Sequence, residues 1–105
     1  MNTRWFEFAT FVPLLRVHGE APFREMWQFG GDKSEAFNAQ LKFDRLRYAM
    51  VPYLYSLAGD VTQKDGTLMR GLVMDFPADK VAREINDEYM FGPAFLVNHV
   101  AGYQL

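Results

Sequence analysis

Residues 11–19 read FVPLLRVHG, and this stretch decides how the rest of the chain is interpreted. Its apolar residues form a short, partly β-branched run, which is typical of a strand covered on both faces, as in a parallel sheet flanked by helices. Because side chains alternate along a strand, Arg16 and His18 share one face, and Gly19 lets the chain turn away after them. Two polar side chains therefore converge at the carboxyl end of a buried strand. That is where α/β folds, and barrels above all, place their ligand sites.

The composition is that of a folded chain and excludes several kinds of partner. Half of the 105 residues are hydrophobic and 16% are aromatic, which is too apolar for a disordered protein. The net charge of −2 and the absence of a Lys/Arg cluster argue against nucleic acid or an anionic membrane surface as a partner. No cysteine is present, which excludes disulfides and thiolate metal sites. The histidines are His18 and His99, with no carboxylates placed beside them, so we predict no metal site.

Neither a membrane span nor a signal peptide is visible in the sequence. No apolar run approaches the roughly 20 residues of a spanning helix. Glu7 interrupts the first ten residues, and the charged, apolar and cleavage regions of a signal peptide are missing. The chain opens almost directly into RWFEFATF (4–11) and closes soon after the apolar run FLV (95–97), so neither end tapers into polar residues. We therefore expect a segment of a larger protein, whose compartment stays unknown.

The segments on either side of the first strand are a helix and a long connection. Residues 2–10 read as the last turns of an amphipathic helix that packs on a sheet. The strand itself is expected at 13–18, because proline is tolerated as the first residue of a strand. The connection 19–32 carries four large apolar residues, which are Phe23, Met26, Trp27 and Phe29. Either these side chains cap the hydrophobic core, or the loop folds over a ligand.

The rest of the chain predicts a βαβ unit. Ser34 can cap a long helix that runs to Ala58, with a kink or a break at Pro52. The apolar run 67–76 reads as a second core strand, and a third strand is expected at 95–97. A strand, a helix and a strand in this order predict parallel strands joined by a right-handed crossover.

Five blocks of the sequence occur in a characteristic order. They are RWFEFATFVPLLRVHG (4–19), REMWQFGG (24–31), RLRYAMVPYLYSLA (45–58), GTLMRGLVMDFP (66–77) and NDEYMFGPAFLV (86–97). Together they resemble glycoside hydrolase family 31, and most of all its α-xylosidase and α-glucosidase branch. The resemblance covers nearly the whole chain, and it implies an α/β fold in which a (β/α)₈ TIM barrel is followed by β domains.

The resemblance also implies a place for each element in that barrel. Residues 13–18 would be the seventh strand, the long helix the seventh helix and 68–76 the eighth strand of a partial barrel that runs into the start of a β domain. Residues 1–80 would be the C-terminal segment of the catalytic barrel. Residues 81–105 would be the end of the barrel and the entry to the proximal β-sandwich domain.

The expected substrate-binding residues are His18, Arg16, Trp27 and Phe29. In the family that the chain resembles, the histidine of an Arg-x-His pattern at the end of the seventh strand hydrogen-bonds a hydroxyl of the sugar being cleaved. His18 matches that position, and the alternative is a core histidine satisfied by a backbone carbonyl. Arg16 lies two residues deeper, where an ion pair with a neighbouring strand competes with sugar contact. Trp27 and Phe29 come from the aromatic loop.

No catalytic residue and no cofactor is expected in this chain. Retaining glycosidases need two carboxyl groups about 5 to 5.5 Å apart, one as nucleophile and one as general acid and base. In the family both are aspartates upstream of the matched blocks. Asp75 lies near the end of the expected eighth strand, and it reads as a structural partner or capping acid, with a place in the pocket as the alternative.

Two functions of different classes follow. The first is a fragment of a retaining, exo-acting α-glycosidase that hydrolyses terminal α-linked sugars in carbohydrate metabolism. Its partners would be an oligosaccharide or glycoside substrate and the rest of the parent barrel. The alternative is a small, non-catalytic α/β binding or interaction module whose aromatic loop meets a partner.

Overall fold

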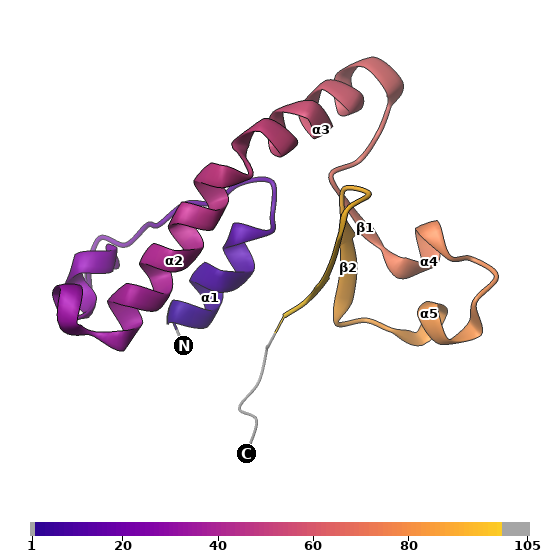
Figure 1. Cartoon of the computed structure of the whole chain (residues 1–105). Coiled ribbons are helices and arrows are strands. Elements are labelled where there is room, and N and C mark those ends of the chain that lie inside the picture. The colour runs from indigo at the N-terminus through magenta and orange to yellow at the C-terminus, as the bar shows by residue number, and fades with distance from the viewer. Residues whose placement is uncertain (1, 100–105) are drawn as a thin grey trace. The chain divides into compact units, whose positions relative to one another are not determined.

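The computed structural model describes residues 2–99. These residues form two compact units, the first ending at Val51 and the second beginning at Pro52. The first unit contains α1 (Asn2–Thr10), the short 3₁₀ helices η1 (Met26–Phe29) and η2 (Gly31–Lys33), and α2 (Glu35–Ala49) (Figure 1). From the boundary onward the elements are α3 (Val51–Lys64), β1 (Met69–Gly71), α4 (Leu72–Asp75), α5 (Lys80–Glu84), β2 (Glu88–Phe91) and β3 (Phe95–Asn98).

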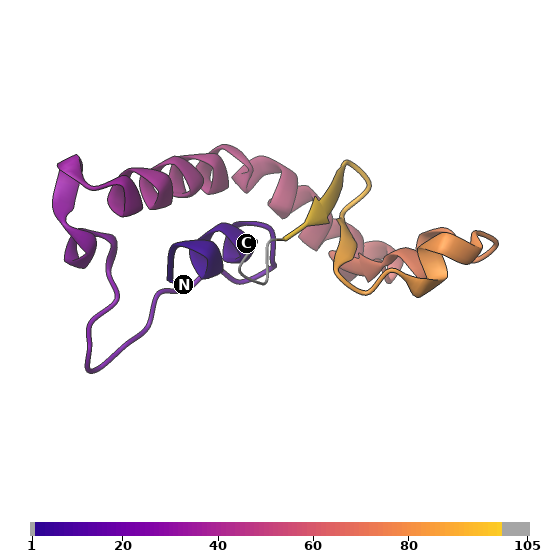
Figure 2. The ribbon, with the colours of Figure 1, turned by 90° about the horizontal axis from the view of Figure 1, so that it is seen from below.

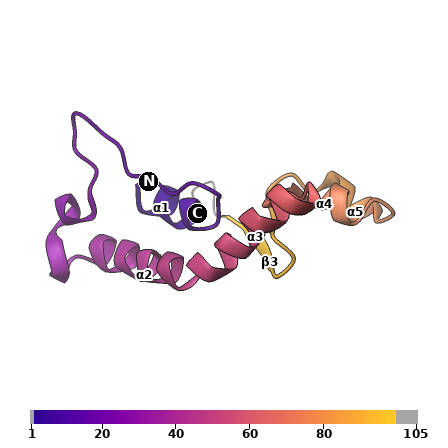
Figure 3. The same cartoon turned by 90° about the horizontal axis from the view of Figure 1, so that it is seen from above.

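In the first unit, α1 lies beside α2, as all three views show (Figures 1, 2 and 3). The predicted helix at 2–10 is confirmed. Phe6 and Thr10 of α1 and Gln40 of α2 are buried, and Gln40 Nε2 donates to Thr3 Oγ1 at 3.4 Å. Trp5, on the same helix, is 62% exposed although it belongs to the helix's apolar residues. The helix thus turns a somewhat different face to its neighbour than its hydrophobic pattern indicated.

The long helix begins and breaks as predicted. Ser34 accepts a hydrogen bond on Oγ from the Phe37 N–H at 3.4 Å, which confirms it as the N-cap of α2. The helix breaks at Met50, and Pro52 is the second residue of α3. Proline is tolerated there, because an N–H in the first turn of a helix has no intrahelical acceptor.

The end of α3 lies further along the chain than expected. The helix continues past Ala58 and through Gly59 to Lys64, whose ammonium pairs with Asp60 at 2.7 Å. It ends at Asp65, which adopts a left-handed conformation with φ of 54°. The Gly66 N–H then donates to the Asp60 carbonyl at 3.2 Å, which satisfies one of the free carbonyls at the helix end.

Residues 13–18 do not form the predicted strand. The structure gives residues 11–25 neither helix nor strand, and Figure 2 shows this segment as an irregular trace between α1 and η1. A strand needs a hydrogen-bonded neighbour, and no other segment within residues 2–99 pairs with this one. Its apolar side chains are accordingly not enclosed, and Leu14 is 75% exposed.

The second unit contains a three-stranded sheet in the order β1-β2-β3. Both pairs are antiparallel, with Met69 opposite Phe91 and Tyr89 opposite Val97. The strand predicted at 95–97 is confirmed, but its partner β2 was not predicted. The parallel βαβ pairing expected from the sequence is therefore wrong for the described residues. The parallel pair was expected between 13–18 and 67–76, and the first of these forms no strand. β1 pairs with β2 instead, and a hairpin around Gly92 joins β2 to β3 antiparallel.

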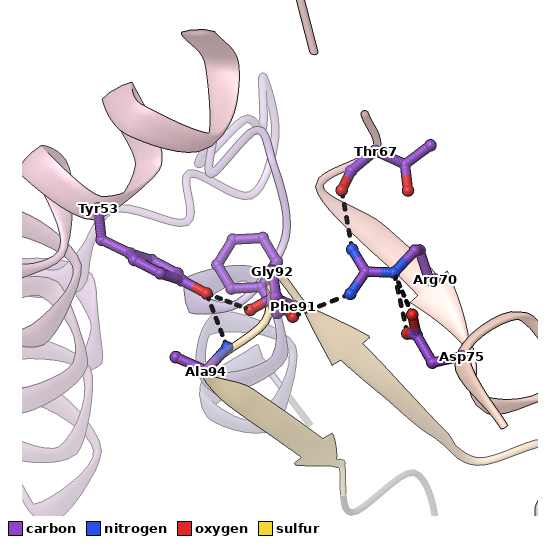
Figure 4. A network of polar contacts seen from close by, with 7 residues as sticks. All are labelled: Tyr53, Thr67, Arg70, Asp75, Phe91, Gly92 and Ala94. Carbon is purple, nitrogen blue, oxygen red and sulfur yellow. Dashed lines mark hydrogen bonds and ion pairs between the residues drawn. The ribbon is translucent and has the colours of Figure 1, made fainter. Parts of the chain in front are cut away.

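The run 67–76 is a short strand followed by a turn of helix, not one long strand. It leaves the sheet at Gly71, and α4 follows directly. The Arg70 guanidinium pairs with the Asp75 carboxylate at 2.9 Å, which folds the chain back on itself (Figure 4). Arg70 also donates to the carbonyls of Thr67 at 3.0 Å and Gly92 at 3.3 Å, so one side chain ties α4 and the hairpin to β1.

Candidate functional site

The predicted site residues Arg16 and His18 line the same pocket in the first unit. Its volume is about 250 Å³. The residues around it are Asn2, Trp5, Phe6, Ala9, Leu15, Arg16, Val17, His18 and Arg24. The pocket therefore has two walls, one from α1 and one from residues 15–18, with Arg24 joining them from the loop that follows.

The wall that α1 supplies follows from helical spacing. Its members, Asn2, Trp5, Phe6 and Ala9, stand at intervals of three, one and three residues, which is one face of a helix. The opposite wall is an extended segment in which Leu15 and Val17 line the pocket together with Arg16 and His18. The strict alternation expected of a strand is therefore wrong here, because the segment lacks the ladder that would enforce it.

Arg24 is the site residue that sequence reasoning missed. It is the first residue of the block REMWQFGG, in which the aromatic residues Trp27 and Phe29 gave the stronger signal of a binding site. A Cβ on Gly19 would lie 2.8 Å from the Pro22 carbonyl oxygen and 3.1 Å from Arg24 Cγ. A glycine at position 19 therefore allows residues 22–24 to pass close to the backbone of residue 19, which brings the Arg24 side chain to the pocket.

Trp27 and Phe29 do not line this pocket. Both belong to η1, which packs against α2, and Trp27 is 65% exposed whereas Phe29 is half-buried. The structure thus brings Arg16 and His18 together but leaves the two aromatic residues apart from them. The role of Trp27 and Phe29 in substrate binding stays a prediction.

The chemistry of the lining is suited to binding a ligand that accepts hydrogen bonds and also presents apolar surface. Two guanidinium groups, one imidazole and the Asn2 amide offer hydrogen-bond donors, and Trp5 and Phe6 offer aromatic surface. A pocket with apolar walls and a few fixed polar groups is the usual form of a small-molecule site. None of its lining residues is Asp or Glu, so these residues offer neither a carboxylate nucleophile nor a carboxylic acid.

Residues 2–99 contain no group of three or more His, Cys, Asp or Glu side chains placed to hold a metal ion. Within the same residues, no helix combines the length and the apolar character needed to cross a membrane.

Asp75 is engaged with Arg70, and replacing it by asparagine is expected to affect stability. The variant loses a charge-assisted hydrogen-bonded pair whose side chains are 19% and 29% exposed, which costs about 1 to 2 kcal/mol. We expect Asp75→Asn to lower the melting temperature of the protein. Asp87→Asn, at an exposed position, is the control. Equal melting temperatures for the two variants would show that the Arg70–Asp75 pair adds no measurable stability.

Comparison with known proteins agrees with this architecture. The family profile described as "Glycosyl hydrolases family 31 TIM-barrel domain" matches residues 1–57, and that described as "Glycosyl hydrolase family 31 C-terminal domain" matches residues 65–104. An α-xylosidase of Saccharolobus solfataricus is 44% identical over 97 residues, covering 92% of this chain and 13% of the relative.

Solved structures extend the comparison. The α-xylosidase of Xanthomonas citri superposes with a TM-score of 0.91 at 50% identity, over 98% of this chain and 11% of that one. A Flavobacterium johnsoniae dextranase, solved in complex with glucose, has a TM-score of 0.86 at 34% identity, over 98% of this chain and 12% of that one. The chain thus spans about an eighth of the length of the relatives that it matches. With one family profile covering more than half of its residues, the chain belongs to glycoside hydrolase family 31.

Proposed function

We propose that this chain is part of a retaining, exo-acting α-glycosidase that hydrolyses terminal α-linked sugars in carbohydrate metabolism. The observation that carries the proposal is the pocket in which Arg16 and His18 face the helix α1, in a chain of this family. An α-xyloside is the preferred substrate, with an α-glucoside as the alternative. The preference rests on the two relatives named α-xylosidases, at 44% and 50% identity, against 34% for the glucose-bound dextranase.

His18 is proposed to hydrogen-bond a ring hydroxyl of the sugar in the subsite where the bond is cleaved. The transition state of glycoside hydrolysis resembles an oxocarbenium ion, and hydrogen bonds to hydroxyls next to the reacting carbon tighten as that charge develops. Arg16 is proposed either to join this contact or to neutralise a carboxylate of a neighbouring strand. Trp27 and Phe29 are proposed to contact the substrate beyond this sugar, or else to cap the hydrophobic core.

The nucleophile and the general acid are proposed to come from other parts of the parent protein. They would be two aspartates about 5 to 5.5 Å apart, on earlier strands and loops of the barrel. This chain then contributes binding energy and orientation to a reaction whose covalent steps occur on groups from elsewhere.

The barrel positions of the elements are proposed as follows. Residues 13–18 take the place of the seventh strand, α2 and α3 that of the seventh helix, and the run 68–76 that of the eighth strand. The barrel profile over residues 1–57 supports a place for 13–18 and α2 in the barrel. The boundary between 1–80 and 81–105 stays a prediction. The profile of the C-terminal domain begins at residue 65, which is earlier than this boundary. Residues 100–105 of the second segment lie outside the described part of the chain.

The direct test is hydrolysis by the parent protein of 4-nitrophenyl α-xyloside and 4-nitrophenyl α-glucoside. We expect release of nitrophenol from both, with the larger kcat/KM for the xyloside. The first sugar product should carry the α configuration in a proton NMR spectrum, because two displacements at the anomeric carbon retain its stereochemistry. Absence of turnover on both substrates, or initial formation of the β anomer, contradicts the proposed function.

The isolated 105-residue chain is expected to release no nitrophenol from either substrate above a matched blank. Neither carboxyl group of the mechanism is expected within it, and a histidine that binds a hydroxyl does not replace a nucleophile. Measurable turnover by the purified chain would show that a carboxylate within these residues performs the chemistry.

The alternative of a non-catalytic binding module rests on the aromatic loop. Phe23 and Trp27 are 62% and 65% exposed, which is the character of side chains that meet a partner. This alternative requires the isolated chain to fold by itself. A cooperative thermal transition of the monomeric chain, together with an inactive parent protein, would support it.

A further inference from the structure

Arg47 contacts the backbone of residues 10–13, which connect the two walls of the pocket. We call these four residues the corner. From α2, its Nη1 donates to the carbonyls of Thr10 at 2.8 Å and Val12 at 2.6 Å, and its Nη2 donates to the carbonyl of Pro13 at 2.8 Å. The side chain is half-buried, and burial lowers the pKa of the Arg47 guanidinium from its ordinary value. The group nevertheless stays charged at neutral pH, because the ordinary pKa of arginine is far above 7.

The three carbonyls that Arg47 contacts have few other donors. Thr10 is the last residue of α1, where the carbonyls of a helix have no intrahelical partner. Val12 and Pro13 begin a segment without strand or helix, so no backbone ladder supplies donors to them. A guanidinium presents several N–H groups in one rigid fork, whereas a lysine ammonium is a single point charge that cannot match three separated acceptors equally well.

The contacts of Arg47 lie between the two walls of the pocket in the chain. Before the corner lies the face of α1 that lines the pocket, and after it lie residues 15–18 with His18. The corner spans residues 10–13, so its conformation sets how far and at what angle the second wall stands from the first.

We propose that Arg47 is a positioning residue of the sugar pocket: by fixing residues 10–13 it sets the place of His18 against α1. The proposal rests on the proposed function of that pocket, and it assigns to an arginine outside the pocket lining a role that goes beyond stability. A shift of about 1 Å in a group that orients the substrate reduces catalysis by up to about 100-fold. The expected effect is therefore kinetic as well as structural.

The first experiment compares Arg47→Lys with Arg45→Lys in the parent protein. Arg45 lies two residues away on the same helix, is exposed and donates none of the three bonds. We expect Arg47→Lys to lower kcat/KM for 4-nitrophenyl α-xyloside about 10- to 100-fold in the folded fraction, and Arg45→Lys to leave it unchanged. If Arg47→Lys lowers only the melting temperature, or the two variants behave alike, the proposal is overturned. Should Arg47→Lys not fold, Arg47→Gln, which keeps a donating amide, is measured in its place.

A double-mutant cycle with His18→Ala separates positioning from general destabilisation. If Arg47 acts through His18, the loss caused by Arg47→Lys shrinks to within about threefold once His18 is absent. Losses that multiply in the double variant show independent roles and overturn the proposal.

A crystal structure of the Arg47→Lys parent protein tests positioning without relying on activity. We expect residues 15–18 to be displaced relative to α1 while the helices keep their places, and an unmoved segment contradicts the proposal. This readout stays valid even if the wild-type protein cleaves neither glycoside. A failure of the proposed function is thereby distinguished from a failure of the positioning role.

Discussion

Replacing His18 by alanine in the parent protein is expected to lower kcat/KM for its glycoside by about 10²- to 10³-fold, which corresponds to about 2 to 4 kcal/mol. The imidazole is proposed to bind a sugar hydroxyl that becomes more acidic as the ring flattens, so its loss harms the transition state more than the ground state. We therefore expect the change mainly in kcat. Melting temperature should change little, because His18 is exposed at the pocket wall in the described unit. Steady-state kinetics with 4-nitrophenyl α-xyloside measure the effect.

Two further variants serve as controls for His18. His18→Gln keeps a hydrogen-bond donor and should restore part of the lost kcat. Leu57→Ala removes a side chain that is only 7% exposed, and it should cost about 2 to 5 kcal/mol of stability through a cavity while the folded fraction keeps its kinetics. If His18→Ala lowers the melting temperature as much as Leu57→Ala and leaves kcat/KM intact, His18 is a structural residue and the site assignment is wrong.

The second large effect is expected from Gly92→Ala, in the hairpin between β2 and β3. Gly92 has φ of 61°, a left-handed conformation that costs a residue with a Cβ about 1 to 2 kcal/mol. The new Cβ would also collide with the Tyr53 hydroxyl and lie 2.7 Å from Leu57 Cδ1. Overpacking of this kind adds about 1 to 3 kcal/mol. We expect a total loss of about 2 to 5 kcal/mol, seen as a lower midpoint of thermal or denaturant unfolding of the C-terminal part.

The clash is severe because Tyr53 is fixed where it stands (Figure 4). Its hydroxyl donates to the Phe91 carbonyl at 2.9 Å and accepts from the Ala94 N–H at 3.2 Å. Its ring makes edge contacts with Phe91 and Phe95, at centroid distances of 6.5 and 5.4 Å. The side chain therefore cannot move aside without breaking the bonds that close the hairpin.

A matched glycine separates backbone strain from the collision. Gly31 has φ of 68°, and a Cβ added there would have no other atom within 4 Å, so Gly31→Ala carries the strain alone and should cost about 1 to 2 kcal/mol. Tyr53→Phe removes the closest contact, and adding Gly92→Ala to it should cost less than Gly92→Ala in the wild type. Equal losses for Gly92→Ala and Gly31→Ala would show that the Tyr53 contact carries no energy.

The helices could be predicted from the sequence because their signals are local. A hydroxyl side chain at Ser34 caps α2 within three residues, and the effect of Pro52 depends on the turn in which it lies. The short helix α5 was missed, although Asp79 accepts hydrogen bonds from the N–H groups of Val81 at 2.8 Å and Ala82 at 3.2 Å. Its five residues are too few to show an apolar period among the charged residues around it.

The strands could not be predicted as reliably, because a strand is defined by its neighbours. Residues 13–18 have the composition of a buried strand but no partner within the described chain. The run 67–76 has the same apolar character, yet the Arg70–Asp75 ion pair turns it back after Gly71. Neither the absence of a partner nor a bond across five residues is visible in hydrophobicity alone.

In the candidate site too, residues with a local signal could be predicted, whereas residues that depend on distant contacts could not. His18 and Arg16 were found because they lie close in sequence at the end of an apolar run, and the structure places both at one pocket. Arg24 reaches that pocket only because the loop returns past Gly19, which spacing does not reveal. The contact of Arg47 with Thr10 crosses 37 residues and depends on how α2 lies along α1.

A crystal structure of the parent protein with xylose bound would decide whether this chain belongs to the substrate site. We expect a hydroxyl of the sugar within about 3.2 Å of a His18 ring nitrogen, in the pocket between α1 and residues 15–18. A sugar bound in the barrel away from this pocket, with His18 hydrogen-bonded to a backbone carbonyl instead, would contradict the assignment.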